Sequence, residues 1–248
     1  MSVNDDKDLK GIENASKVAK HLREYLAKNC VTGISTRYLD ELCKNEMKAI
    51  GAKSAPRMFY NAPSYSFYSK NNQVVHGLPD NIQLKNGDLV KIDVTPYYEG
   101  FISDTACTVI VGGYEQNVIG EKMVKSTIES FNKALEHCKN KSKINEIGRA
   151  IENNTKSDGF FVIHELCGHG VGRAVHEEPA VLNYYEKSQK EKLKTGLVIA
   201  IEPMIVNKKS IVREANDGWA IKTTDGTLTA HYEHTVLITE TEPVILTA

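Results

Sequence analysis

The chain has 248 residues, of which 41% are hydrophobic and 25% are charged, and its formal net charge is -1. This composition is typical of a soluble globular protein, and so small a charge excludes a strong field favouring nucleic acid or an anionic membrane. No apolar run approaches the roughly 18 residues of a membrane span, and the polar, acidic N-terminus is unlike a secretory signal. Five cysteines without a C-x-x-C pair are typical of reduced thiols, so we expect a cytoplasmic protein.

The predicted elements follow one order twice: two helices, then strands. In the first half we expect helices over about 8–28 and from a cap at Ser35 or Thr36 to Gly51, an irregular stretch over 52–72, and strands over 89–97 and 101–111. In the second half we expect helices over about 116–138 and from a cap at Ser142 to about 158, and strands over 160–163, 197–206 and 229–239. The halves share no residue-level similarity, so this order alone predicts an internally duplicated α+β fold in a single domain, residues 1–248.

Asp93 and Asp104 are expected to share one face of the hairpin in the first half. If Tyr98-Glu99 form its loop, the two carboxylates lie directly opposite each other, and if Glu99-Gly100 form it, they are diagonal neighbours. A three-residue loop would separate them. Adjacent like charges destabilise a hairpin, and a bound cation would remove that penalty. The alternative interpretation is a pair of acids that face solvent.

Two further acids and a glycine-rich segment are the other candidates for the functional site. Glu202 and Glu233 lie inside apolar strands, where a carboxylate is costly unless it is paired with an arginine or bound to metal. Segment 164–179 holds three histidines and three acids, and its glycines favour a bent backbone whose imidazoles face a common space. It is not an H-E-x-x-H helix, because His169 comes one residue too late. Four acids with His169 would form an oxygen-rich, two-metal site.

A series of motifs, in this order and spacing, resembles type I methionine aminopeptidases from about residue 9 to the end of the chain. The motifs are Val75-His76-Gly77-Leu78-Pro79, Ile92-Asp93-Val94, Ser103-Asp104-Thr105, Cys167-Gly168-His169-Gly170-Val171-Gly172-Arg173, His176-Glu177-Glu178-Pro179, Ile201-Glu202-Pro203-Met204 and Tyr232-Glu233-His234-Thr235. The resemblance implies the pita-bread α/β fold, whose pseudo-twofold agrees with the repeated order of elements.

The resemblance also implies roles for the motif residues. Asp93 would chelate one of two divalent ions, while Asp104 and Glu233 would bridge both. His169 and Glu202 would complete the shell of the other ion, and Glu202 would also transfer protons. The two histidines outside the ligand set, His76 and His176, would contact the scissile amide. The ions, which could be Co, Mn, Fe or Zn, would activate water and stabilise the oxyanion.

The substrate pocket departs from the pattern that the family usually shows. Phe59 and Trp219 match aromatic pocket positions. Phe67 stands where the family usually has cysteine, Ala62 replaces a pocket aromatic, and Val175 stands where phenylalanine is frequent. The pocket is therefore expected to be repacked, which leaves its selectivity for methionine open, because such changes shift preference by about 1–3 kcal/mol.

His231 is a further departure, because the family usually has glutamine there. It lies two residues before Glu233 and so shares its face of the strand. A hydrogen bond to a metal ligand is its expected role, and direct metal ligation is the alternative.

The implied function is removal of the initiator methionine from nascent proteins whose second residue is small. The expected partners are the N-terminal peptides of nascent proteins, bound transiently at the ribosome. We expect a monomer that binds neither nucleic acid nor membrane. Three alternatives stay open: a same-fold aminopeptidase with another N-terminal preference, a proline-directed peptidase, and a non-catalytic binding protein. The second usually has an additional N-terminal domain for which this chain has no room, and the third would have lost ligands that are all present here.

Overall fold

The structure is a computed structural model that describes residues 1–248. Its helices are α1 (Asp6–Asn29), α2 (Thr36–Ile50), α3 (Ala55–Tyr60), α4 (Val118–Leu135) and α5 (Asn145–Ser157), with a 3₁₀ turn, η1 (Tyr114–Gln116). Its strands are β1 (Lys53–Ser54), β2 (Phe67–Lys70), β3 (Gln73–Val75), β4 (Leu89–Val94), β5 (Pro96–Tyr98), β6 (Phe101–Ile102), β7 (Thr105–Ile110), β8 (Phe161–Val162), β9 (Cys167–Gly170), β10 (Glu177–Leu182), β11 (Val198–Ile201), β12 (Met204–Val206), β13 (Val212–Glu214), β14 (Ile221–Thr223), β15 (Thr229–His231), β16 (Glu233–Leu237) and β17 (Val244–Ile245). None of the helices combines the length and the apolar character that crossing a membrane requires.

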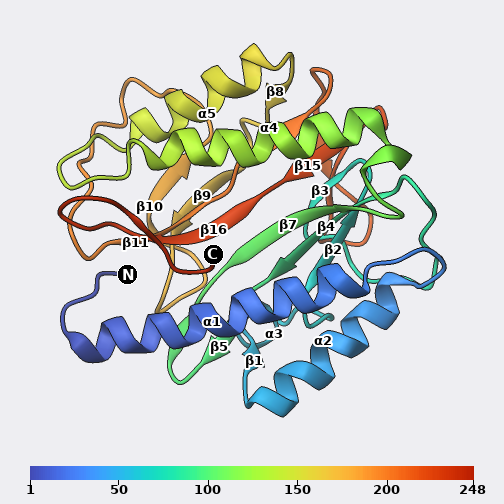
Figure 1. Ribbon diagram of the computed structural model, residues 1–248, viewed down its shortest axis with the longest axis horizontal. Helices are drawn as coiled ribbons and strands as arrows, with labels where there is room; N and C mark the ends of the chain where they lie inside the picture. The colour runs from blue at the N-terminus through green and yellow to red at the C-terminus, as the bar shows by residue number, and fades with distance from the viewer.

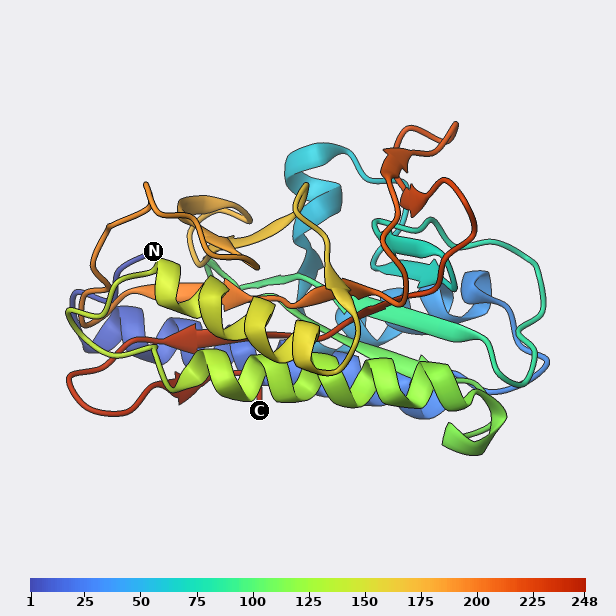
Figure 2. The same ribbon diagram turned by 90° about the horizontal axis from the view of Figure 1, so that it is seen from above.

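A curled sheet of eight strands lies at the centre of the molecule (Figure 1). Its strand order is β10-β9-β11-β16-β7-β4-β2, with β17 paired to β16, and all of these pairs are antiparallel. The four long helices lie along one side of the sheet, and α3 and the β13–β14 hairpin stand on the other side (Figure 2). The sheet therefore has one face covered by helices and one face left for a site.

Side-chain alternation explains why the helices cover that face. In β4, Val90, Ile92 and Val94 belong to one buried apolar cluster with residues of α1 and α2. Because successive side chains of a strand point to opposite faces, Asp93 points away from the helices. In the second half, α4 and α5 cover β11 and β16 through an apolar cluster of their own. Each half thus contributes two helices and its strands, which confirms the predicted duplicated α+β order.

The hairpin follows one of the two predicted registers. Glu99 and Gly100 both have positive φ, at 48° and 90°, and form its two-residue turn. Asp93 is opposite Ala106, so Asp104 is its diagonal neighbour rather than its direct partner. Both acids nevertheless reach the face that the helices leave free.

The predicted helix caps were right in the first half and wrong in the second. The Ser35 side chain accepts a hydrogen bond from the α2 backbone, and α2 ends at Gly51 in the left-handed conformation. Ser142 does not cap α5, which begins after Ile144 without a side-chain cap. Ser142 lies in the preceding turn, where its carbonyl accepts a hydrogen bond from the Leu193 backbone.

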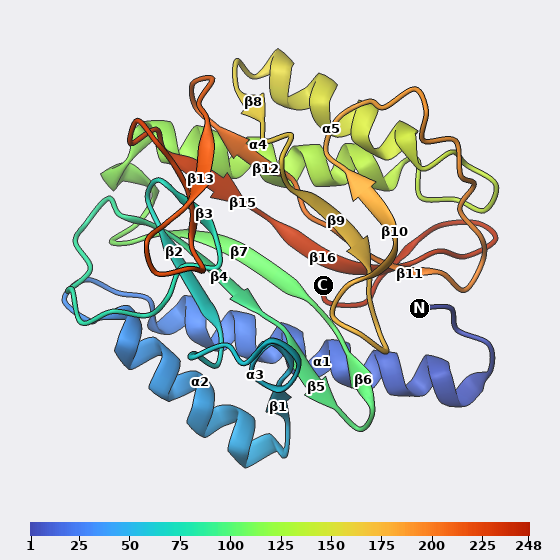
Figure 3. The same ribbon diagram turned by 180° about the vertical axis from the view of Figure 1, so that it is seen from behind.

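The glycine-rich segment is straighter than predicted. Residues 167–170 form β9, which lies between β10 and β11 (Figure 3). A Cβ at Gly168 would lie 2.3 Å from the Ala200 carbonyl oxygen, and one at Gly170 would lie 2.4 Å from that of Glu178. These glycines are therefore needed because neighbouring strands approach closely on both sides of His169, rather than because the backbone bends there.

Candidate metal centre and substrate pocket

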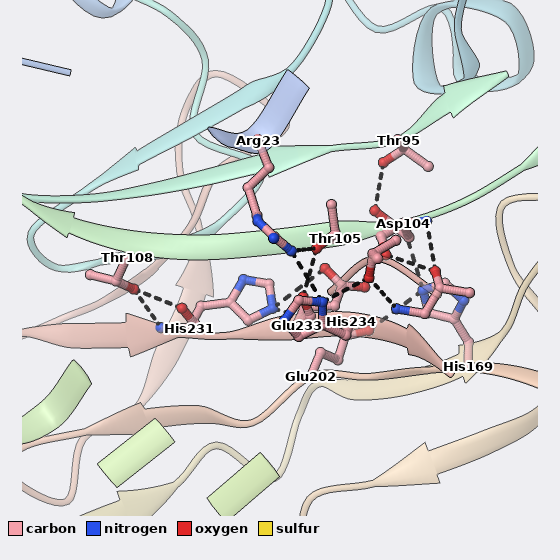
Figure 4. Close-up of polar contacts among 12 residues, drawn as sticks. Arg23, Thr95, Asp104, Thr105, Thr108, His169, Glu202, His231, Glu233 and His234 are labelled. Carbon is pink, nitrogen blue, oxygen red and sulfur yellow. Dashed lines mark hydrogen bonds and ion pairs between the residues drawn. The ribbon is translucent and has the colours of Figure 1, made fainter. Parts of the chain in front are cut away.

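The five predicted metal ligands line one cavity on the free face of the sheet. Figure 4 shows four of them, Asp104, His169, Glu202 and Glu233. They come from five strands that are consecutive in the sheet, β9, β11, β16, β7 and β4. Asp93 lies in β4, Asp104 just before β7, Glu233 at the start of β16, Glu202 just after β11, and His169 in β9. The order of the strands thus brings together residues that are far apart in the sequence.

The side-chain atoms of this cluster are close enough to share an ion. Nε2 of His169 lies 3.5 Å from Oε1 of Glu202 and 3.9 Å from Oδ2 of Asp104. One potential ligand atom from each of Asp104, His169 and Glu233 lies within 4.8 Å of the others. All of these side chains are buried, so water cannot screen their charges effectively.

No lysine or arginine forms an ion pair with the four carboxylates. Their ion-pair contacts within 4 Å are with histidines alone, and Oδ1 of Asp93 is buried without any hydrogen-bond partner. Burial raises the pKa of Asp104 to about 6, and it raises the pKa values of Asp93, Glu202 and Glu233 well above their usual range, with repulsion from Asp104 adding to each. Buried acids with an orphan oxygen, beside one imidazole, fit a site for divalent ions.

His169 has the tautomer that a metal ligand needs. Its Nδ1 lies 2.9 Å from the Gly170 carbonyl oxygen, which can only accept, so Nδ1 donates and Nε2 keeps its lone pair toward the cavity. Burial also lowers the pKa of His169 to about 4, which keeps the ring neutral. Asp104 is held from behind by Thr95, whose hydroxyl donates to Oδ1 at 2.9 Å.

His76 and His176 line the same cavity. The rings of His169 and His176 are 4.4 Å apart between centroids. His76 has a left-handed backbone with φ 57°, and the next residue, Gly77, fits against Ser69, whose Cα would lie 2.6 Å from an added Cβ. Burial lowers the pKa of His76 to about 4 and also lowers that of His176, so both rings are neutral at pH 7.

A pocket of about 340 Å³ adjoins the carboxylates and contains most of the predicted substrate-binding residues. Phe67, Val175 and Trp219 line it together with both histidines. The Phe67 ring lies 5.8 Å from the Trp219 ring and 5.1 Å from the His76 ring, between centroids.

The structure does not bring Phe59 into this pocket. Its side chain is half exposed and lies against Tyr97, with ring centroids 6.3 Å apart. Tyr60 lines the pocket instead, and its hydroxyl lies 2.8 Å from Nδ1 of His176. Pro56 and Tyr60 are one helical turn apart on α3 and face the pocket together. Tyr60 is absent from the predicted site because α3 lies in a stretch that was expected to be irregular.

His231 lies behind the cluster rather than in it. Its Nε2 is 3.7 Å from Oε2 of Glu202 and 3.8 Å from Oε2 of Glu233. These separations are longer than a hydrogen bond, so the contact expected from the sequence is not formed in this structure. Burial lowers the pKa of His231 to about 3.

Known proteins resemble the chain over its whole length. The sequence model of Metallopeptidase family M24 matches residues 10–240. Methionine aminopeptidase 2 of Bacillus subtilis is 39% identical over 249 residues, which cover 100% of this chain and 99% of the relative. Crystal structures of methionine aminopeptidases from Rickettsia prowazekii and Thermotoga maritima superpose with TM-scores of 0.95 and 0.94 at 30% and 33% identity. They cover 100% of this chain and 100% and 99% of theirs.

These matches confirm the pita-bread fold that the motifs implied. The family model spans most of the chain, and relatives more than 30% identical match it from end to end. The chain therefore belongs to metallopeptidase family M24.

Proposed function

We propose that the protein is a methionine aminopeptidase, a hydrolase that removes the N-terminal methionine of peptides and newly made proteins. The observation that carries this proposal is the convergence of four carboxylates and His169, all buried or half-buried, beside an aromatic pocket. The names of its full-length relatives support it. The proposed substrates are cytoplasmic chains with a small second residue. The enzyme is proposed to act as a monomer and to contact the ribosome only transiently.

The carboxylate cluster is proposed to hold two divalent ions. Asp93 would bind one ion, Asp104 and Glu233 would lie between the two, and His169 and Glu202 would bind the other. When bound, the ions supply a water nucleophile at neutral pH and stabilise negative charge on the attacked carbonyl. The ligand set, four carboxylates and one imidazole, suits Mn, Fe, Co or Zn, so the metal present depends on its availability.

The residues around the cluster are proposed to move and hold protons. Glu202, which faces the cavity beside His169, is proposed to take a proton from water and return it to the leaving amine. When the Tyr60 hydroxyl donates to Nδ1 of His176, the neutral ring carries its own proton on Nε2. That N–H, and one from neutral His76, are the donors that a developing oxyanion requires.

The pocket is proposed to take the side chain of the first residue. Phe67 and Trp219 provide flat apolar walls, against which a flexible thioether packs well. A changed preference for the first residue is the second candidate function, favoured by the bulk of Phe67 next to His76.

A panel of X-Ala-Ser peptides, with X varied, tests both candidates at defined metal loading. We expect release of methionine to be fastest, and to require added metal. Fastest release of another residue would support the second candidate. No release of any residue at full metal occupancy would overturn the proposed aminopeptidase activity.

A further inference from the structure

The imidazole ring of His231 has no hydrogen-bond partner although it is buried. It is the last residue of β15, its side chain is 1% exposed, and neither Nδ1 nor Nε2 contacts a donor or acceptor at hydrogen-bond distance. Buried polar atoms are nearly always satisfied, so an imidazole with both nitrogens unpaired requires an explanation. Its surroundings suggest that the missing contact belongs to another state of the protein.

The His231 ring points toward Glu202 and Glu233, two of the proposed metal ligands (Figure 4). Glu202 lies between two imidazoles, with one carboxylate oxygen directed to each: Oε1 is 3.5 Å from Nε2 of His169, and Oε2 is 3.7 Å from Nε2 of His231. His231 also lies 3.8 Å from Oε2 of Glu233. It therefore faces two proposed metal ligands from the side opposite His169.

A row of buried polar residues holds His231 in this place. The hydroxyl of Thr108 donates to the His231 carbonyl at 2.7 Å and accepts from its backbone N–H at 3.0 Å. Thr108 is opposite Lys91 on β4, two residues from the pairing of Asp93 with Ala106. The backbone of His231 is thus fixed in register with the strands that carry the ligands, so its ring position is not accidental.

The charges around the ring indicate where its proton lies. Lys91 is fully buried and forms no ion pair, and its ammonium donates to the carbonyl oxygens of Asn71 and Thr229. Thr229 is two residues before His231 on β15, so this cation is bound to the same strand as the histidine. A neutral imidazole whose Nε2 faces two acids is most stable with its proton on Nε2.

We propose that His231 is a positioning residue of the metal centre, whose Nε2–H donates to the carboxylates of Glu202 and Glu233 when metal is bound. This inference rests on the proposed two-metal function. An imidazole N–H that donates to a carboxylate forms a short and strong charge-assisted hydrogen bond. A shift of about 0.8 Å would bring either oxygen to an ordinary N–H···O distance. The bonds would fix how the carboxylates face the ions.

Direct metal ligation by His231 is the rival role. Its distances to the two acids resemble those between His169 and its acidic neighbours. All five proposed ligands line the cavity, however, whereas His231 does not line it and faces Glu202 and Glu233 from behind. A donor that supports the ligands therefore fits the geometry better than a further ligand.

Calorimetric titration of Mn²⁺ into metal-free protein tests the proposal with two variants. His231→Leu removes the donor, and we expect metal affinity to fall by about 10–100-fold, the usual effect of losing such a supporting contact. His231→Gln retains an N–H donor and should restore affinity to within about threefold of the original protein. His164→Leu is the matched control, because His164 is exposed and stacks on Tyr184 outside the cavity.

Two further measurements separate positioning from folding and from ligation. Melting of the metal-free variants should show that His231→Leu is at least as stable as the original protein, because it removes an unsatisfied buried group. At saturating Co²⁺, the visible absorption bands of both variants should keep their positions and intensities, because the ligand set is unchanged.

Unchanged Mn²⁺ affinity in His231→Leu would overturn the proposal. So would altered Co²⁺ bands in both His231 variants, which would instead make His231 a ligand. If the original protein itself bound no metal, the proposed function would fail rather than this inference.

Discussion

The metal cavity and the substrate pocket share His76, His176, Asp93 and Asp104, yet they are built from different parts of the fold. The cavity takes its proposed ligands from five consecutive strands in the middle of the sheet. The rest of the pocket comes from α3, from the start of β2 and from connections such as the turn that carries Trp219. A rigid sheet fixes the chemistry, whereas peripheral segments shape what enters, so changes to the two regions should have separable effects.

The largest effect should follow from a change inside the cavity. We expect Asp104→Asn to lower kcat by about 10³-fold or more, because a neutral amide cannot bridge two cations. The same change removes a buried charge from the acidic cluster, so the metal-free variant should be more stable by about 1–3 kcal/mol above pH 6. Peptide hydrolysis and thermal melting in a chelator measure the two outcomes. A variant that lost activity and metal-free stability together would contradict the proposed role of the cluster.

The next effect tests a residue that both regions share. His76→Ala should lower kcat by about 10²–10³-fold, because it removes one N–H donor for the developing oxyanion. Metal affinity should stay unchanged, since His76 is not among the proposed ligands. Steady-state kinetics combined with Mn²⁺ titration gives both values. Full activity would refute the role of His76, and weaker metal binding would move it into the ligand set.

A smaller effect should follow from a change in the pocket alone. Phe67→Leu replaces an aromatic wall beside Trp219 with a smaller side chain. We expect the ratio of kcat/KM between methionine and larger apolar first residues to shift by about tenfold toward the larger ones, which is typical of such pocket changes. Mn²⁺ affinity should not change. The peptide panel provides the ratios, and an unaltered ratio would mean that Phe67 does not contact the first side chain.

The same division explains what the sequence could predict. Asp93, Glu202 and Glu233 could be predicted because the alternation of side chains along a strand and the strongly apolar neighbours indicate a carboxylate inside a buried strand. For a hairpin with a two-residue loop, the sequence allowed two strand registers. Only the turn conformation at Glu99-Gly100 could decide between them. Tyr60 was missed because its direction depends on the short helix α3, which has too few residues to show a period.

The smallest predicted effect is the pH dependence of folding stability. It depends on the titratable side chains of the cavity rather than on the apolar side chains of the pocket. A carboxyl whose pKa is raised in the folded chain stabilises it most at low pH, and this contribution is lost as the pH rises through the folded value. That value is about 6 for Asp104, and the pKa values of the other three acids are also raised well above their usual range. Buried His169 acts oppositely, because its pKa is lowered to about 4 and its contribution is lost as pH falls below the unfolded value of about 6.5. Above about pH 6.5, the only remaining change in folding stability is therefore the decrease caused by ionisation of the carboxyls.

We therefore expect the metal-free protein to become less stable as the pH rises above about 6.5, whereas the metal-loaded protein should not. Metal ligands must be deprotonated, so binding of Mn²⁺ at pH 7 should release protons from the acidic cluster. Titration calorimetry in two buffers of different ionisation enthalpy counts those protons. Phe67→Leu should leave the count unchanged, because it alters only the pocket. Equal heats in both buffers would mean that the four carboxyls are already ionised in the folded, metal-free chain, and the cavity would then need a source of positive charge that its neighbours do not provide.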